Sequence, residues 1–146
     1  MKIDLQKIKC YFLTCNNLKK NNIRKEFHNC NLVEINPIMG ISKFRSGITG
    51  FLRIINKSIQ NQKEKNSFEP FIILEDDVRK YRDFPNELEI PEDSDILYIG
   101  LSKWGITTNP NQGVEDSVKY TSINKDIVKI YNMLSTHGML ISSIQG

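Results

Sequence analysis

The sequence predicts an α/β protein with a mixed sheet flanked by helices, and three observations support this prediction. Short apolar runs alternate along the first half of the chain with segments whose apolar residues recur at helical spacing, an alternation typical of parallel strands covered by helices. The 146 residues suffice for one domain with a real core, so residues 1–146 are expected to form a single domain. The composition, 39% hydrophobic and 25% charged, is typical of a soluble globular protein.

The beginning of the chain divides into elements at recognisable signals. Residues 10–14 form a short apolar run and are predicted to be a buried strand. Asn16 and Asn17 are good N-cap residues for a helix over residues 18–27. A second short strand is predicted over residues 31–35.

A long amphipathic helix is predicted next, with Ser46 as its N-cap. Its apolar residues fall at helical spacing and are expected to form one continuous stripe in the core. The stripe consists of Ile48, Phe51, Leu52, Ile55 and Ile59. The polar segment 60–66 is expected to end the helix in a loop.

The second half of the chain is predicted to contain four more strands. Residues 71–74 are four apolar residues of strand length, and an irregular, proline-containing connection joins them to a strand over residues 96–100. Asn, Pro and Gly at residues 109–113 indicate a turn within a long loop. Residues 127–134 and 138–141 are interpreted as two adjacent strands.

Three consecutive carboxylates, Glu75, Asp76 and Asp77, follow the apolar run 71–74 directly. Side chains alternate along a strand, so Glu75 and Asp77 are expected on one face and Asp76 on the other. Carboxylates crowded at a strand end repel each other unless a positive charge lies between them, and a divalent cation that prefers oxygen ligands meets this need. On composition alone, the simpler interpretation is a solvated acidic turn with the two basic residues that follow, Arg79-Lys80, as counter-charges.

Thr14 and the acidic cluster both fall at the carboxyl ends of predicted strands, where ligands bind in open α/β sheets. Arg24, Lys43 and Arg45 could then contact a phosphate, and Gly47, with the glycine three residues later, could let the backbone approach it at a helix start. The alternative is that these are ordinary surface charges and packing glycines.

Three motifs in order resemble one family. The run I-L-E-D-D-V is followed by S-D-I-L-Y-I-G at residues 94–100 and by S-T-H-G-M-L-I-S at residues 135–142. This series is similar to GT-A-fold glycosyltransferases of the lipopolysaccharide-biosynthesis and procollagen galactosyltransferase-like family, including those of large DNA viruses. The resemblance extends from about Tyr11 to the last residue and implies a GT-A, Rossmann-like mixed sheet.

The chain also departs from the family pattern. The Ser-His pair that bacterial members carry before the acidic strand is missing at residues 50–55, and their N-terminal Asn-Leu-Asp-Arg-Arg stretch is matched only loosely at residues 13–20. Family members continue beyond the point corresponding to Gly146. We therefore expect a domain that lacks the C-terminal acceptor-side part, with strands near residues 127–134 and 139–141 exposing apolar side chains to a second copy or a partner chain.

The resemblance implies roles for the site residues. Asp77 and Glu75 would ligate Mn²⁺ (or Mg²⁺), with His137 as a further ligand or a diphosphate contact, and Asp76 would accept a hydrogen bond from the ribose or sugar hydroxyls. A lone histidine is otherwise an ordinary structural residue. Thr14, Arg24 and Gly47 complete the expected nucleotide-sugar site.

The implied function is metal-dependent transfer of a sugar, of the hexosyltransferase kind, from a nucleotide-sugar donor to a glycan or protein hydroxyl, with UDP as the family's usual nucleotide. No residue can be assigned as the base that takes the acceptor's proton. One alternative is a shortened non-catalytic nucleotide-binding or interaction module of the same fold. Another is nucleotidyl transfer or hydrolysis by metal-bound carboxylates.

Charge and composition limit the remaining classes. The net charge of +3 is small and the lysines are spread along the chain, so no nucleic-acid partner is expected. No apolar stretch has the length of a membrane span or of a signal peptide, which predicts a cytoplasmic protein, or a virion protein if the source is viral.

The three cysteines, Cys10, Cys15 and Cys30, are odd in number and lack the paired spacing of metal sites. They are interpreted as reduced thiols, with Cys10 and Cys15 partly buried at the two ends of a strand. The alternative is a zinc site completed by His28.

Overall fold

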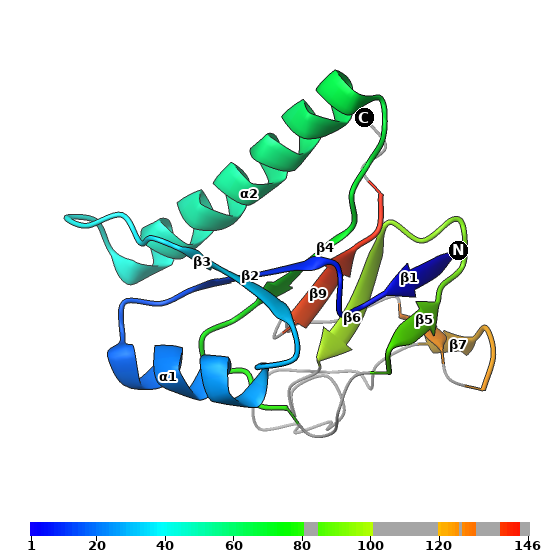
Figure 1. The fold of residues 1–146 in the computed structure, drawn as a ribbon, viewed down its shortest axis with the longest axis horizontal. Helices are drawn as coiled ribbons and strands as arrows, with labels where there is room; N and C mark the ends of the chain where they lie inside the picture. The colour runs from blue at the N-terminus through cyan, green and yellow to red at the C-terminus, as the bar shows by residue number, and fades with distance from the viewer. Residues whose placement is uncertain (81–84, 101–119, 126, 131–137, 144–146) are drawn as a thin grey trace.

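The computed structural model describes five segments of the chain, drawn in colour in Figure 1: residues 1–80, 85–100, 120–125, 127–130 and 138–143. The turn expected at residues 109–113 and the expected site residue His137 lie outside these segments.

The described residues form two helices and nine strands. In chain order they are β1 (Lys2–Asp4), β2 (Lys9–Leu13), α1 (Asn17–Glu26), β3 (Asn31–Ile35), α2 (Lys43–Lys65), β4 (Phe71–Leu74), β5 (Glu87–Glu89), β6 (Ile96–Gly100), β7 (Tyr120–Ser122), β8 (Val128–Ile130) and β9 (Gly138–Ile141).

Five of the strands form one mixed sheet in the order β3-β2-β4-β9-β6. β2 pairs in parallel with β3 and β4, whereas β9 is antiparallel to both of its neighbours, β4 and β6. The pairs β1–β5 and β7–β8 are separate antiparallel ribbons. The expected α/β architecture with a mixed sheet and helices is therefore confirmed. It is compatible with a Rossmann-like fold but is not specific for one.

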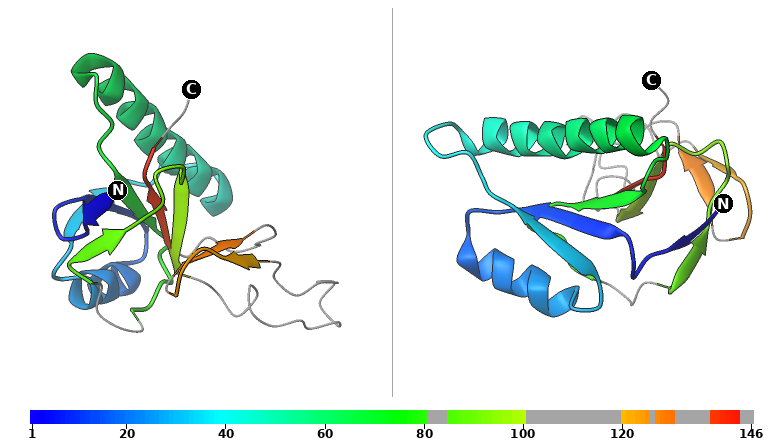
Figure 2. Two further views of the ribbon diagram at one scale, coloured as in Figure 1. Left: turned by 90° about the vertical axis from the view of Figure 1, so that its right-hand side faces the viewer. Right: turned by 45° about the horizontal axis from the view of Figure 1, so that its top comes forward.

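The sheet has a core on each face, because side chains alternate along its strands. On one face Phe12 packs with Phe27, which follows α1, and on the other Ile73 packs with Ile54 of α2. Figure 2 shows the two helices on opposite sides of the sheet. All four residues of β4 are buried, as predicted for a strand that is covered on both faces.

The N-terminus of α2 differs from the prediction. The helix begins at Lys43, and its N-cap is Ser42, whose Oγ accepts a hydrogen bond from the Arg45 N–H at 3.3 Å. Ser46 lies inside the first turn, where its Oγ accepts a hydrogen bond from the Ile38 N–H at 2.9 Å. The prediction of Ser46 as the cap was wrong because both serines satisfy the same local signal, and only the path of the preceding loop distinguishes them.

The C-terminal end of α2 also differs. The helix continues through the polar segment to Lys65, and Asn66 ends it in a left-handed conformation with φ 49°. The loop predicted over residues 60–66 was wrong because Gln, Lys and Glu are good helix formers even where they bury nothing. Neither of the two helices in the described segments has the combination of length and apolar character needed to cross a membrane.

The buried face of α2 matches the predicted stripe in part. Ile54 is 3% exposed, whereas Leu52, which was placed in the core, is 51% exposed, and Ile48 is exposed as well. The helix packs through Gly50, where an added Cβ would lie 2.3 Å from Leu13 Cδ1. The predicted stripe was right for Phe51 and Ile55, which pack against the core, and wrong for Ile48 and Leu52. A glycine that allows close approach leaves no mark in an apolar pattern.

The C-terminal strands are arranged differently from the prediction. The two strands expected to be adjacent lie in different sheets, since β8 pairs with β7 and β9 is inserted between β4 and β6. Leu140 and Ile141 of β9 are buried, so the expected apolar exposure of residues 139–141 was wrong. On β8, Val128 is exposed, and the neighbouring Ile127 is buried. Leu140 packs in the core on one face of the sheet and Ile141 in the core on the other, which explains their burial.

Candidate functional site

The order of the sheet reverses between β2 and β4. The connection from β2 through α1 leads outward to β3, whereas the connection from β3 through α2 crosses back to β4 on the other side of β2. In open α/β sheets, ligands bind outside the carboxyl ends of the strands at such a reversal. Thr14 directly follows β2, and Asp76 stands two residues beyond β4, so both lie at this place.

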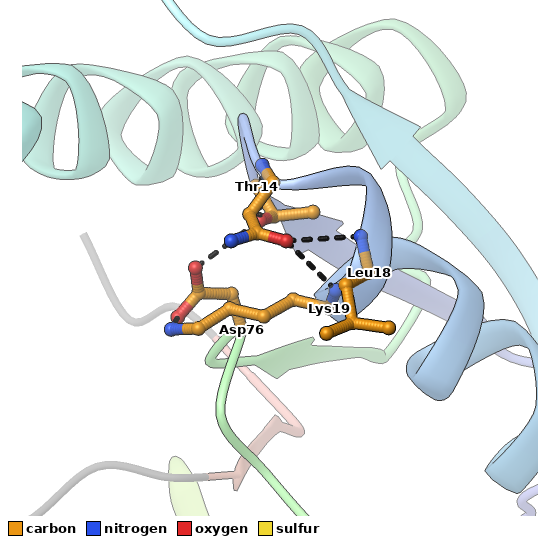
Figure 3. Close-up of polar contacts among 5 residues, drawn as sticks. Thr14, Leu18, Lys19 and Asp76 are labelled. Atoms are coloured by element: carbon orange, nitrogen blue, oxygen red, sulfur yellow. Dashed lines mark hydrogen bonds and ion pairs between the residues drawn. The ribbon is translucent and has the colours of Figure 1, made fainter.

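A network of three side chains connects these two strand ends (Figure 3). The buried Thr14 hydroxyl donates a hydrogen bond to Asp76 Oδ2 at 3.1 Å, across 62 residues of sequence. Lys19 Nζ lies 2.7 Å from Asp76 Oδ1. We call Thr14, Lys19 and Asp76 the carboxylate network. It fixes the turn after β4 to the end of β2 and to the first turn of α1.

The start of α1 adds partial positive charge to this place. Asn16, one of the two predicted candidates, is the N-cap, and its Oδ1 accepts hydrogen bonds from the N–H groups of Leu18 at 2.9 Å and Lys19 at 3.1 Å. The first turn carries no acidic side chain of its own. Asp76, from the turn after β4, therefore provides the negative charge that a helix N-terminus favours.

The surroundings of Lys19 favour its protonated form. Its pKa is raised chiefly by the hydrogen bond to Asp76, and the negative charges of Asp76 and Asp77 act in the same direction. The Lys19 side chain is 41% exposed and that of Asp76 is 34% exposed, so solvent screens the pair and its contribution to stability is modest.

A second contact holds the same turn to the other end of α1. The Glu26 carboxylate accepts a hydrogen bond from the Lys80 N–H at 2.8 Å and pairs with Arg79 Nη1 at 2.7 Å. These contacts lower the pKa of Glu26, the backbone N–H of Lys80 most strongly and the Arg79 guanidinium next. The interpretation of Arg79 as a counter-charge for the acidic cluster was therefore wrong: Arg79 pairs with Glu26, and Lys19 is the partner of Asp76.

The acidic cluster itself is not an extension of the strand. β4 ends at Leu74, and a turn follows in which the Val78 N–H donates to the Glu75 carbonyl oxygen at 3.3 Å. A turn does not keep the two-residue alternation of a strand, so the geometric reason for placing Glu75 and Asp77 on one face was wrong. Glu75 is half-buried and Asp77 is exposed.

The acidic cluster offers the type of ligand that a divalent cation prefers, but it does not offer enough ligands by itself. Carboxylate oxygens are the ligands that Mg²⁺ and Mn²⁺ prefer. Within the described segments, however, no three His, Cys, Asp or Glu residues gather into a group that could hold a metal ion. A metal at Glu75 and Asp77 would need further ligands, from His137, from a bound diphosphate or from water.

Two other residues expected in the site, Arg24 and Gly47, are not joined to the carboxylate network by any described contact. Arg24 pairs with Glu34 of β3 at 3.0 Å, and Lys20 pairs with the same carboxylate. Gly47 lies near the start of α2 with open space where a Cβ would point. No described contact brings Arg24 or Gly47 to the carboxylate network.

Lys19 is the cation that the sequence prediction missed. Phosphate contacts had been expected instead from other basic residues, among them Arg45, which is exposed, and Lys43, whose side chain is outside the described set. The signal for Lys19 was present: it stands three residues after the N-cap Asn16, in the first turn of the helix that leaves the end of β2.

A cavity of about 290 Å³ lies elsewhere, against the opposite edge of the sheet. Its lining includes Lys9 and Phe71, the first residues of β2 and β4, and Ser58 and Asn61 of α2. Because these residues lie at the amino ends of the strands, we do not include the cavity in the candidate site.

Comparison of the chain with protein-family models, with curated proteins and with solved structures finds no match in any of the three. Function is therefore inferred from the residues and contacts of this chain.

Proposed function

We propose that the chain binds the diphosphate of a nucleotide-sugar at the carboxyl ends of β2 and β4 and transfers the sugar to a glycan or protein hydroxyl, as a GT-A-like glycosyltransferase. The carboxylate network at the reversal of strand order is the observation that carries this proposal. The motif resemblance supports it independently, because the I-L-E-D-D-V run ends in the same turn.

The chain's own residues offer a diphosphate positive charge from two sources. Lys19 is a protonated ammonium, and the first turn of α1 presents the positive end of a helix dipole. Thr14 positions Asp76, and Asp76 in turn positions Lys19. Departure of the sugar leaves negative charge on the diphosphate, and a cation already held in place stabilises that charge without reorganisation.

Asp76 has room for one more role. A carboxylate has about four acceptor sites, and Thr14 and Lys19 occupy two of those on Asp76. A ribose or sugar hydroxyl can donate to a remaining site. Asp76 would thereby connect the donor's hydroxyls to the same network that faces its phosphates.

The proposed metal ligands are Glu75, Asp77 and His137, with Mn²⁺ (or Mg²⁺) as the ion. When bound, such an ion would neutralise charge on the diphosphate as a Lewis acid. The carboxylate oxygens of the turn are suited to this ion in type, and imidazole favours Mn²⁺ over the harder Mg²⁺.

A second function is favoured by one observation. Lys19 already provides a positive partner for Asp76, so this carboxylate does not require a metal for its own stability. A non-catalytic nucleotide-binding or interaction module of the same fold would keep this arrangement without catalysing transfer.

Calorimetric titration of UDP-sugars in Mn²⁺ and in EDTA tests the proposal. We expect tighter binding in Mn²⁺, and we expect the double variant Glu75→Gln/Asp77→Asn to lose that difference while remaining folded. Glu69→Gln is the matched control, because it makes the same kind of change at the opposite end of β4, where the exposed Glu69 pairs with Lys65 at 2.6 Å.

The outcomes separate the alternatives. Equal affinity in Mn²⁺ and EDTA would remove the metal from the proposal, and no binding in either would refute the site. Binding without release of UDP in the presence of glycan or protein acceptors would favour the non-catalytic module.

A further inference from the structure

Cys10 and Cys30 form a pair of thiols on the α1 side of the sheet. Cys10 is 0% exposed within β2, and the half-buried Cys30 directly precedes β3. β2 and β3 are parallel neighbours in which Cys10 is opposite Leu32, so a residue two positions before Leu32 falls on the same face. Cys10 belongs to the core cluster on this face and Cys30 packs against it, and the two thiol groups are close enough for a hydrogen bond between them to shift the pKa of both.

The two thiols differ in acidity. The hydrogen bond from Cys10, helped by the positive charge of Lys80, lowers the pKa of Cys30 to about 7. The same hydrogen bond, together with burial, raises the pKa of Cys10. Cys30 is therefore the partner that carries the thiolate at neutral pH, and the thiolate is the nucleophilic form of cysteine.

We propose that Cys30 and Cys10 are a modification site, a reactive thiol pair that a hydroperoxide converts into an intramolecular disulfide. The Cys30 thiolate attacks the terminal oxygen of the peroxide, which breaks the O–O bond and leaves a sulfenic acid on Cys30 and an alcohol or water as the reduced product. The Cys10 sulfur then attacks the Cys30 sulfur and displaces water. Two thiols lose two electrons in all, and one peroxide gains them.

The partner is already in position for the second step. A sulfenic acid reacts with a neighbouring thiol when that thiol is within reach, and the pairing of β2 with β3 places Cys10 beside Cys30 in the same core before oxidation. Cys10 is closed off from solvent, so it would meet Cys30 before any external thiol.

Cys15 is a natural comparison within the same chain. It is an exposed free cysteine that follows Thr14 at the opposite end of β2. If accessibility alone decided oxidation, Cys15 would react first. The proposal predicts instead that Cys30 reacts first.

The disulfide would close a loop that contains the whole of α1. It would join the start of β2 to the start of β3 and restrict the unfolded chain, so the oxidised protein should melt roughly 5 to 10 °C above the reduced one. Removal of the disulfide by dithiothreitol should reverse the shift.

The test treats the reduced full-length chain with equimolar hydrogen peroxide and maps its peptides by mass spectrometry without reduction. We expect a peptide pair linked through Cys10 and Cys30 in the natural chain and equally in Cys15→Ser. We expect no such link in Cys30→Ser. In Cys10→Ala, the sulfenic acid on Cys30 should persist and be captured by dimedone.

Two results would overturn the proposal: a folded natural chain in which the two cysteines stay unlinked, or oxidation of Cys15 ahead of Cys30. Cys10→Ala removes a core side chain and could fail to fold. The map of Cys15→Ser, which changes an exposed residue only, then decides the question alone.

Discussion

Replacement of Lys19 by methionine separates binding from folding at the candidate site. Lys19→Met removes the ammonium that lies 2.7 Å from Asp76 Oδ1 and keeps a side chain of similar length and good helix propensity. The Thr14 hydroxyl still donates to the Asp76 carboxylate, so that carboxylate retains a partner. The change therefore tests the cation and leaves the rest of the network in place.

The expected loss of stability is small. The two side chains are 41% and 34% exposed, so screening limits the pair to less than about 1 kcal/mol. The pKa of Lys19 is raised in the folded protein, so this contribution is fully present below the unfolded pKa and is lost only as the pH rises through the folded pKa. The free energy of unfolding measured at neutral pH therefore includes the whole contribution of this ion pair.

The expected loss of binding is larger. A charge-assisted hydrogen bond to a phosphate is worth about 1.5 to 3 kcal/mol, which corresponds to roughly a 10- to 150-fold rise in Kd. Calorimetry with UDP gives the affinity, and urea unfolding of the same preparation gives the free energy of unfolding.

Lys20→Met is the matched control. Lys20 is the next residue of α1 and is also ion-paired, but with Glu34 of β3 and not with Asp76. Its loss should cost a similar amount of stability and leave the affinity for UDP unchanged. Equal affinity losses in both variants, or none in Lys19→Met, would refute the assignment of Lys19 to the site.

Two further predictions concern the contact that holds the segment after β4 and the packing of α2. Glu26→Gln should cost about 1 kcal/mol of unfolding free energy at neutral pH, because the Lys80 N–H and Arg79 lower the pKa of Glu26. The stability that comes from a lowered pKa is present above the ordinary value of 4.5 and is lost as the pH falls through the folded pKa. Urea unfolding across acidic pH should show the two proteins converging, and a difference that persists at the lowest pH would contradict this cause. Ile54→Ala should cost about 2 to 5 kcal/mol and Leu52→Ala less than about 1 kcal/mol, since the first side chain is 3% exposed and the second 51%. The reverse order in thermal melts would mean that α2 packs through the stripe predicted from the sequence.

The elements that sequence analysis placed well are those whose signals are local. Four apolar residues before three carboxylates define β4 as a strand with acids at its carboxyl end, and the pair Asn16-Asn17 marks the start of α1 to within one residue. The strands Asn31–Ile35, Ile96–Gly100 and Gly138–Ile141 were predicted with their observed bounds. The position of the candidate site followed as well, because the carboxyl ends of parallel strands meet at one edge of a sheet.

The partners of these elements depend on residues far away in the sequence, and only the tertiary structure decided them. Lys19 and Asp76 are 57 residues apart, and nothing near Asp76 distinguishes Lys19 from the closer Arg79 as its counter-charge. β9 lies between β4 and β6 because buried backbone groups must be paired across strands, a requirement that any of several apolar runs could have met. α2 turns Ile54 inward because Gly50 lets the helix approach Leu13. Whether a glycine allows such an approach depends on the residue that faces it in the folded protein.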